Sequence, residues 1–305
     1  MTDMDVSEKG TQTALRRRPS EDVAAHPDGR SSDTAGAGAS VTIVPTRSSG
    51  RWRPPRALRR TIGPLLVLLI WYVSSATGLL PPVIMVSPTD TAIQAWTLIA
   101  DCRLLSALGA SATRVLIGFL IGSTVAVVLA LSAGLFRLGE DLVDSTVGML
   151  RTVPWVGLTP LFVVWLGIDE APKIALVALG VSLPLYFNLY GGIRGVDTQL
   201  VESGTALGLG RLGMIRHVIL PGALPGGLVG LRYSLGTAWL ALVFAEQINA
   251  TSGIGYLMRN AQQYYQLDVI VVCLVLYAIL GLLCDLTVRL VGRWLLSWRA
   301  SFEGV

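Results

Sequence analysis

The chain has 305 residues, of which 52% are hydrophobic and 14% are charged. Soluble domains have about 25% charged residues, so this chain has too little polar surface to cover a soluble particle of its size. Its formal net charge is +4, and 22 of its 24 basic residues are arginine. A nucleic-acid-binding protein would gather these arginines on one folded face. Here they flank apolar runs, which excludes a nucleic-acid partner and indicates contact with membrane lipid.

Residues 1–57 are expected to form a disordered tail, because Ser, Thr, Ala, Gly, Asp and Arg dominate them without apolar periodicity. Residues 58–300 contain all the long apolar runs and are expected to form one transmembrane domain. The first run, 61–80, is longer than the apolar region of a signal peptide, which has about 7–15 residues. We therefore expect it to be a retained helix.

Six apolar segments have the length needed to cross a bilayer, about 20 residues. They are 61–80, 115–136, 141–167, 174–193, 224–248 and 269–288. The sequence therefore predicts an all-α integral membrane protein with six transmembrane helices. Twelve basic residues lie on one set of connections and three on the other. By the positive-inside rule this places both termini in the cytoplasm.

Two further segments are expected on the outer side. Residues 89–105 have apolar residues at helical spacing, namely Ile93, Trp96, Ile99 and Leu104, and are expected to form a short helix at the membrane interface. Residues 249–268 combine glycines with tyrosines and are expected to form a partly embedded lip.

Few residues suit catalysis or metal binding. The two histidines are His26 and His217, and the three cysteines have no C-x-x-C spacing, so neither a metal site nor a His-based triad is expected. Lys9 and Lys173 do not follow the glycines of a phosphate-binding loop. We therefore expect no enzyme activity and no bound cofactor.

The most informative segment is 198–221, between the fourth and fifth spans on the cytoplasmic side. Its first half is expected to be an amphipathic helix, which Gly208 and Gly210 end. A second helix is expected from Leu212 to Ile219, ended by Pro221. An ordered helix, turn and helix of this length in the cytosol indicates a partner.

This segment resembles the EAA motif of ABC importer permeases, with small residues in place of both alanines. The resemblance implies a coupling helix that docks on a separate ATP-binding cassette ATPase, which would use ATP and Mg. The positions that it assigns to coupling are Glu202, Ser203, Gly204, Ala206, Leu207, Gly208, Leu220 and Pro221. It further implies a type I permease fold, a homodimer, an external solute-binding protein and a location in the bacterial inner membrane.

A wider resemblance covers about residues 80–296. The stretches 111–119, 151–156, 165–168, 192–194 and 238–246 are similar to permeases for aliphatic sulfonates, taurine and nitrate. The resemblance implies a small anion as the transported solute. A permease for a pyrimidine vitamin precursor or another small solute and, in a different class, an autonomous secondary transporter remain as alternatives.

Charged residues inside spans are costly unless they face protein or water. The predicted substrate pathway consists of two residues of the third span, Arg151 and Trp155, and one helical stripe of the fifth span: Arg232, Gly236, Trp239, Val243 and Glu246. Pairing with a neighbour is the alternative role for each charge. Glycines at G-x-x-x-G spacing in the second and fifth spans suit either a homodimer seam or packing within one subunit.

Overall fold

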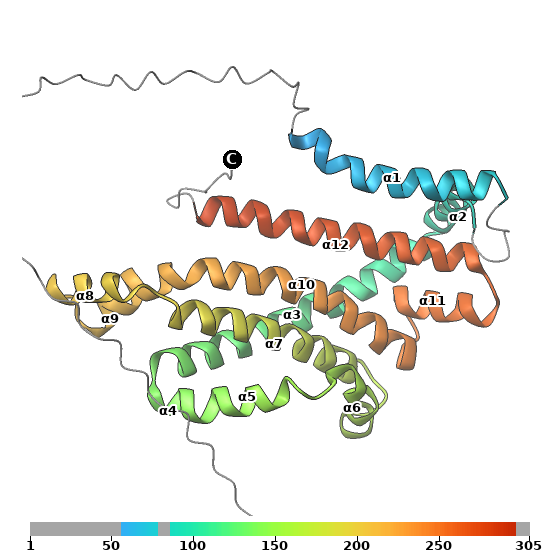
Figure 1. Ribbon diagram of the computed structural model, residues 1–305. Coiled ribbons are helices and arrows are strands. Elements are labelled where there is room, and N and C mark those ends of the chain that lie inside the picture. The colour runs from blue at the N-terminus through green and yellow to red at the C-terminus, as the bar shows by residue number, and fades with distance from the viewer. Residues whose placement is uncertain (1–55, 79–85, 297–305) are drawn as a thin grey trace, which may run out of the picture. The chain divides into compact units, whose positions relative to one another are not determined.

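The structure is a computed structural model that describes residues 56–78 and 86–296. All regular elements in these ranges are helices (Figure 1). The α-helices are α1 (Arg56–Ala76), α2 (Pro88–Ala100), α3 (Arg103–Leu135), α4 (Arg137–Gly139), α5 (Ser145–Leu150), α6 (Thr159–Leu166), α7 (Ala171–Arg194), α8 (Thr198–Ala206), α9 (Arg211–Met214), α10 (Leu220–Asn249), α11 (Ile254–Gln263) and α12 (Leu267–Leu295). The predicted tail lies outside the described residues except for its last two positions.

Four of the six predicted spans are confirmed as helices long and apolar enough to cross a membrane: α3, α7, α12 and the run Arg211–Ile248, which includes α10 up to Ile248. The first predicted span corresponds to α1, whose apolar part Ile62–Ala76 is shorter. Residues 79 and 80 of that span lie outside the described residues. Over residues 56–78 and 86–296 the protein is thus an all-helical membrane protein with four candidate spans, or five if a broken helix pair counts as one.

That broken pair is the third predicted span, 141–167, which is not one straight helix. The part Arg137–Leu150 and the part Trp155–Leu166 meet at 85°. The break falls at Arg151–Pro154. Pro154 has no N–H to continue the helical hydrogen bonds, and it disfavours helical backbone at Val153.

Helix α7 is the centre of the bundle, with α3 and α10 packed along it. Glycines bring the backbones together. A methyl group at Gly122 of α3 would lie 2.3 Å from the carbonyl oxygen of Ala178, and one at Gly226 of α10 would lie 2.8 Å from that of Asn188. Both G-x-x-x-G patterns therefore serve packing within the subunit, one of the two roles that the sequence allowed.

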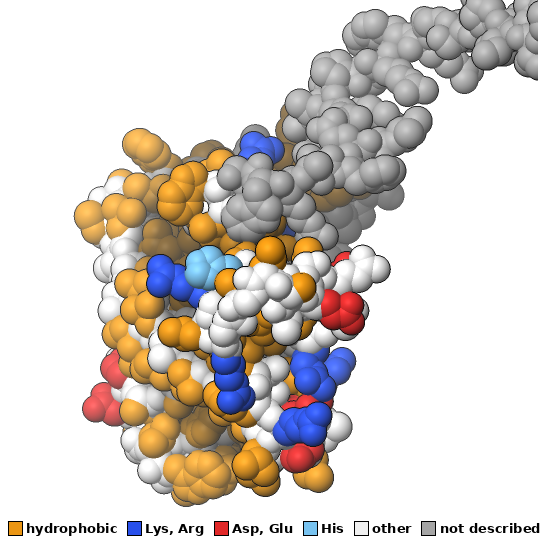
Figure 2. All heavy atoms as spheres, turned by 90° about the vertical axis from the view of Figure 1, so that its left-hand side faces the viewer, with side chains coloured by type: hydrophobic (Ala, Val, Ile, Leu, Met, Phe, Trp, Pro, Cys, Tyr) orange, Lys and Arg blue, Asp and Glu red, His pale blue; other side chains and the backbone are white. Residues whose placement is uncertain are grey.

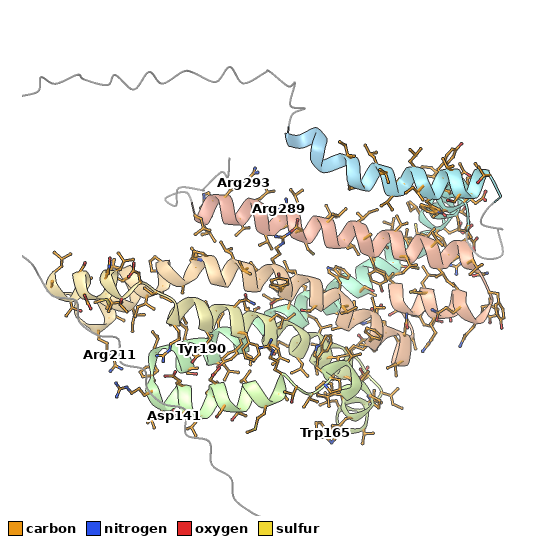
Figure 3. All side chains as sticks on the ribbon, in the orientation of Figure 1. Asp141, Trp165, Tyr190, Arg211, Arg289 and Arg293 are labelled. Carbon is orange, nitrogen blue, oxygen red and sulfur yellow. The ribbon has the colours of Figure 1, made fainter. Side chains whose placement is uncertain are left out.

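The two ends of the bundle differ. Helices α8 and α9 lie at the same end as the C-terminal end of α12, whereas α2, α6 and α11 lie at the opposite end (Figure 1). Figure 2 faces the α8 end and shows basic and acidic side chains among hydrophobic ones. Arg211 and Arg293 lie toward this end, and Trp165 lies toward the other (Figure 3).

Two predicted boundaries between the first and second spans are wrong. The interfacial helix ends at Ala100 rather than at residue 105, because Cys102 adopts a left-handed backbone with φ 57° and starts a new helix. Leu104 consequently belongs to α3, where it is buried. The second span begins at Arg103 rather than 115, because the charge of Arg114 is paired inside the protein and does not end the helix.

Pro221 also does not end a helix, contrary to expectation. It occupies the first turn of α10, where its missing N–H is tolerated, and the preceding residues Ile215–Ile219 form a π-helical turn. The wider π turn takes up the proline without breaking the chain direction. The result is a continuous 38-residue helical run from Arg211 to Ile248.

Candidate functional site: coupling segment and membrane groove

The turn after α8 is built by local hydrogen bonds. Asp197 caps the start of α8 by accepting a hydrogen bond from the Gln199 N–H at 2.9 Å. At the other end, the N–H of Leu209 donates to the Gly204 carbonyl and that of Gly208 to the Thr205 carbonyl, both at 3.0 Å. This is a Schellman motif, which needs a left-handed residue after the helix. Gly208 supplies it with φ 79°.

Helix α8, the turn at 207–210 and helix α9 together form an elbow. Its two helices approach each other at Gly204. A methyl group there would lie 2.9 Å from Met214 Cε and 3.2 Å from Leu209 Cδ1. A small residue therefore suits Gly204, where the EAA motif has alanine, because a single methyl group needs only a small movement of these flexible side-chain ends.

The outer surface of the elbow is exposed. Glu202, Ser203, Ala206 and Gly208 are exposed, and Leu207 is 83% exposed. A groove of about 450 Å³ runs beneath α8. Its lining is Leu200, Ser203, Gly204, Leu207, Leu209, His217, Val218, Pro221 and Gly222. An exposed leucine beside an apolar groove is a surface suited to contact with another protein.

The predicted pathway stripe on α10 divides into two parts. Arg232 and Gly236 line an open groove between α10 and α12. Trp239 is half-buried and donates from its Nε1 to Cys284 Sγ at 3.3 Å, and Val243 is half-buried. Glu246 has no exposed surface. Only the half of the stripe nearer the α8 end is open.

Glu246 instead belongs to a buried polar cluster at the opposite end. Its carboxylate accepts hydrogen bonds from Arg114 Nη1 at 2.7 Å, from Ser111 Oγ at 2.8 Å and from the Gly255 N–H at 2.8 Å. Arg114 also donates to the Ser252 carbonyl oxygen at 2.7 Å. Of the two roles left open for Glu246, the structure shows pairing with a neighbour.

Glu170 and Lys173, which lie outside α10, extend this cluster. Arg114 forks onto Glu170, donating from Nη2 to Oε1 at 2.9 Å, and Lys173 Nζ donates to the same oxygen at 2.8 Å. These bonds hold the pKa of the Glu170 carboxyl, which lies in the loop before α7, at about 2 instead of 4.5, against a smaller opposing effect of burial. The cluster therefore ties α3, α10, α11 and this loop together.

Arg114, Glu170 and Ser111 were not predicted as a site from their sequence positions. Ser111 and Arg114 did form part of the stretch that resembles sulfonate permeases. A second signal was a buried charge next to an apolar run, which requires a partner of opposite sign. The sequence did not show which carboxylate is that partner, since Glu246 is 132 residues away.

Arg151 and Trp155 lie at the break between α5 and α6. The Arg151 guanidinium sits over the ring of Phe187 on α7, 5.3 Å from its centroid. Trp155 is half-buried, and its ring lies 3.4 Å from the position that a methyl group on Gly180 would take. The structure thus places both residues against α7, apart from the groove that holds Arg232.

Comparison with known proteins identifies the class of this helical membrane protein. Residues 118–297 match the family described as binding-protein-dependent transport system inner membrane component. The chain is 45% identical over 240 residues to SsuC of Escherichia coli K12, named as an aliphatic sulfonates transport permease, covering 79% of this chain and 91% of that protein. It is 30% identical over 263 residues to TauC of the same organism, a taurine transport system permease, covering 84% and 96%.

A solved structure gives the same fold. A chain of an amino acid ABC transporter, crystallised with histidines, superimposes with a TM-score of 0.56 at 14% identity, over 65% of this chain and 96% of that chain.

The protein belongs to the family of binding-protein-dependent transport system inner membrane components. It is the non-catalytic permease of an ABC importer, homologous to aliphatic sulfonate and taurine permeases. Such a component works with an ATPase and a solute-binding protein in the inner membrane. Membership in a binding-protein-dependent family excludes the autonomous secondary transporter.

Proposed function

We propose that two copies of this chain form the membrane passage of a type I importer for a small organic anion of the sulfonate class. Support for the solute comes from the 45% identity to a sulfonate permease and from the arginines at the helix break and in the groove. An external binding protein would deliver the anion. A separate ATPase would use ATP and Mg, and we propose no cofactor on this chain.

We propose six crossings with both termini in the cytoplasm. In this arrangement α1 is the first crossing and the bent pair around Arg151 is the third. The placement of α8 and of the C-terminal end of α12 at one end of the bundle supports it (Figure 1). Nitrate, and precursors of pyrimidine vitamins, are less well supported as solutes, because neither the relatives' names above nor the arginines favour them over a sulfonate.

The observation that carries the proposed mechanism is the helical run that follows the elbow. The exposed turn at Gly208 is followed by a helical run that continues without a break from Arg211 to Ile248. A helix is stiff over this length, so a push on Leu207 or Glu202 is passed along the run to the membrane half of α10. We propose that ATPase closure moves α10 in this way.

The test is ATP-driven uptake by the complete transporter in proteoliposomes, with the double variant Glu202→Arg and Gly208→Trp. A tryptophan at φ 79° and a reversed charge disrupt the elbow surface but leave the membrane helices unchanged. We expect loss of uptake with normal insertion of the permease. The matched control is Asp141→Arg, the same charge reversal at an exposed site near the same end (Figure 3).

The control is expected to transport at the wild-type rate. Wild-type uptake by the double variant would refute docking through this elbow. Equal loss in both variants would show a general effect of charge at this end of the protein.

A further inference from the structure

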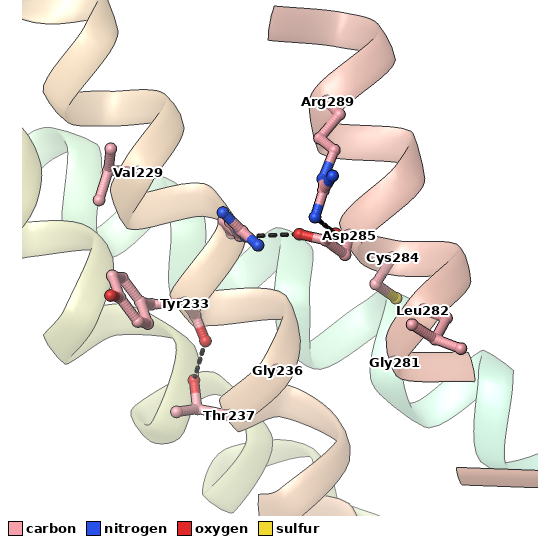
Figure 4. A pocket seen from close by; sticks show the side chains of 10 residues that line it. Val229, Tyr233, Gly236, Thr237, Gly281, Leu282, Cys284, Asp285 and Arg289 are labelled. Carbon is pink, nitrogen blue, oxygen red and sulfur yellow. Dashed lines mark hydrogen bonds and ion pairs between the residues drawn. The ribbon is translucent and has the colours of Figure 1, made fainter. Parts of the chain in front are cut away.

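The groove between α10 and α12 holds the open half of the predicted pathway stripe and contains a cluster of charged side chains. Its volume is about 920 Å³, and its lining is Val229, Arg232, Tyr233, Gly236, Thr237, Gly281, Leu282, Cys284, Asp285 and Arg289 (Figure 4). Gly236 and Gly281 stand on opposite walls, and a methyl group on either would meet open space. The groove is therefore wide enough for a solute of a few heavy atoms.

Three of these residues form one charge cluster. Asp285 pairs through Oδ1 with Arg232 Nε and through Oδ2 with Arg289 Nη2, the latter at 2.6 Å. The side chains of Arg232 and Arg289 are 54% and 51% exposed, whereas Asp285 is 22% exposed. Each guanidinium carries five N–H donors, and only one nitrogen of each pairs with Asp285, so both arginines, which line the groove, keep donors for a further partner.

The cluster has a net charge of +1, because two arginines share one carboxylate. Among the described residues no other carboxylate lies within ion-pair distance of either arginine. Because both arginines are about half exposed to the groove, this excess positive charge is accessible to an anion, and one negative charge neutralises it. A doubly charged anion would instead leave the cluster with a net charge of −1. The planar donors of arginine also match the oxygens of an oxyanion.

We propose that Arg232, Asp285 and Arg289 bind one singly charged oxyanion group, such as a sulfonate, and that Asp285 excludes doubly charged anions. This inference rests on the proposed function, since it names the solute contact inside the passage. Asp285 acts here as a specificity residue. It lowers the charge of the arginine pair to the value that a monoanion neutralises.

The test is binding to the purified permease in nanodiscs, with ethanesulfonate as the monoanion and sulfate as the dianion. The wild type is expected to bind ethanesulfonate and to discriminate against sulfate. Asp285→Asn raises the cluster charge to +2 and is expected to gain sulfate binding. Arg232→Gln or Arg289→Gln is expected to weaken ethanesulfonate binding by at least about tenfold, because hydrogen bonds to charged groups are among the stronger ones.

The matched control is Arg293→Gln, one turn further along α12 and outside the groove lining, which is expected to bind as the wild type does. Thermal unfolding of each variant identifies any variant that fails to fold. If Asp285→Asn fails to fold, the two arginine variants still test the site. Nanodiscs with and without phosphatidylglycerol distinguish the solute from a lipid phosphate. If the groove retains phosphatidylglycerol and ethanesulfonate does not displace it, the site binds lipid phosphate and the proposal is wrong.

Unchanged ethanesulfonate binding in both arginine variants would also overturn it. ATP-driven uptake by the same variants in the complete transporter separates the two proposals. If sulfonate uptake persists while the arginine variants bind normally, only the cluster assignment fails. If the wild-type complex moves no sulfonate, the proposed function itself fails.

Discussion

Glu246 shows how one buried carboxylate fixes the residues around it. Gly253 has φ 113°, and a methyl group on it would lie 2.3 Å from Glu246 Oε1. One on Gly255 would lie 2.6 Å from Glu246 Cβ. The Glu246 side chain therefore requires glycine at both positions, and its carboxylate accepts a hydrogen bond from the Gly255 N–H.

We expect Gly253→Ala to destabilise the permease by about 1–3 kcal/mol or more, from backbone strain and steric clash. The control is Gly109→Ala on α3, where a methyl group meets open space and alanine favours the helix. Thermal unfolding in detergent, followed by near-UV circular dichroism, compares the two. Equal stability would show that Glu246 does not depend on the close approach of this backbone.

Glu170 supports a prediction about pH. Its pKa in the folded protein is about 2, below the ordinary 4.5, so its ion pairs stabilise the fold above pH 4.5 and are lost as the pH falls toward 2. We expect Glu170→Gln to lower stability by a constant amount at neutral and mildly acidic pH. The difference from the wild type should shrink only below pH 4.5. A difference that already disappears near neutral pH would contradict the assigned pairing with Arg114.

At the scale of elements, α7 holds α3 and α10 through glycine contacts. Gly122→Ala places a methyl group 2.3 Å from the Ala178 carbonyl oxygen, which belongs to the backbone and cannot move aside without shifting a helix. We expect a loss of about 1–3 kcal/mol, the usual effect of overpacking a core. Gly191→Ala on α7, where no atom lies within 4 Å, is the control and should be neutral. Thermal unfolding of the two variants checks this, and a neutral Gly122→Ala would mean that α3 is held elsewhere.

The bent pair around Arg151 is the element whose form departs most from the expected one. Its composition predicted a single span, because both halves are apolar and only Pro154 marks the break. A proline inside a membrane helix is compatible with a kink as well as with the observed 85° bend. The packing of Trp155 and Arg151 against α7 decided between them.

At the scale of the whole molecule, the ends of the bundle predict how the protein lies in the membrane. Cys102 is exposed between α2 and α3, and Leu207 is exposed on the elbow at the other end. In intact cells a membrane-impermeant thiol reagent is expected to label Cys102. Leu207→Cys, with Cys102 and Cys284 replaced by serine, should be labelled only after permeabilisation. Labelling of Leu207→Cys in intact cells would show that the orientation in the membrane is the opposite one.

The sequence alone determined the class of the protein, the approximate position of its long membrane helices and the small residue pattern of the coupling segment. These follow from local properties: apolar length, arginine distribution and the requirement for glycine in a tight turn. It also restricted the charges in the membrane to a few roles.

Only the tertiary structure decided between those roles. It paired Glu246 with Arg114 and Asp285 with Arg232 and Arg289, and it assigned the glycine patterns to packing on α7. It also carried the helix through Pro221 and bent the chain at Pro154. The reason is that a buried charge or a glycine in the sequence shows only that some neighbour must lie close to it. Which distant residue meets that need depends on how the helices pack.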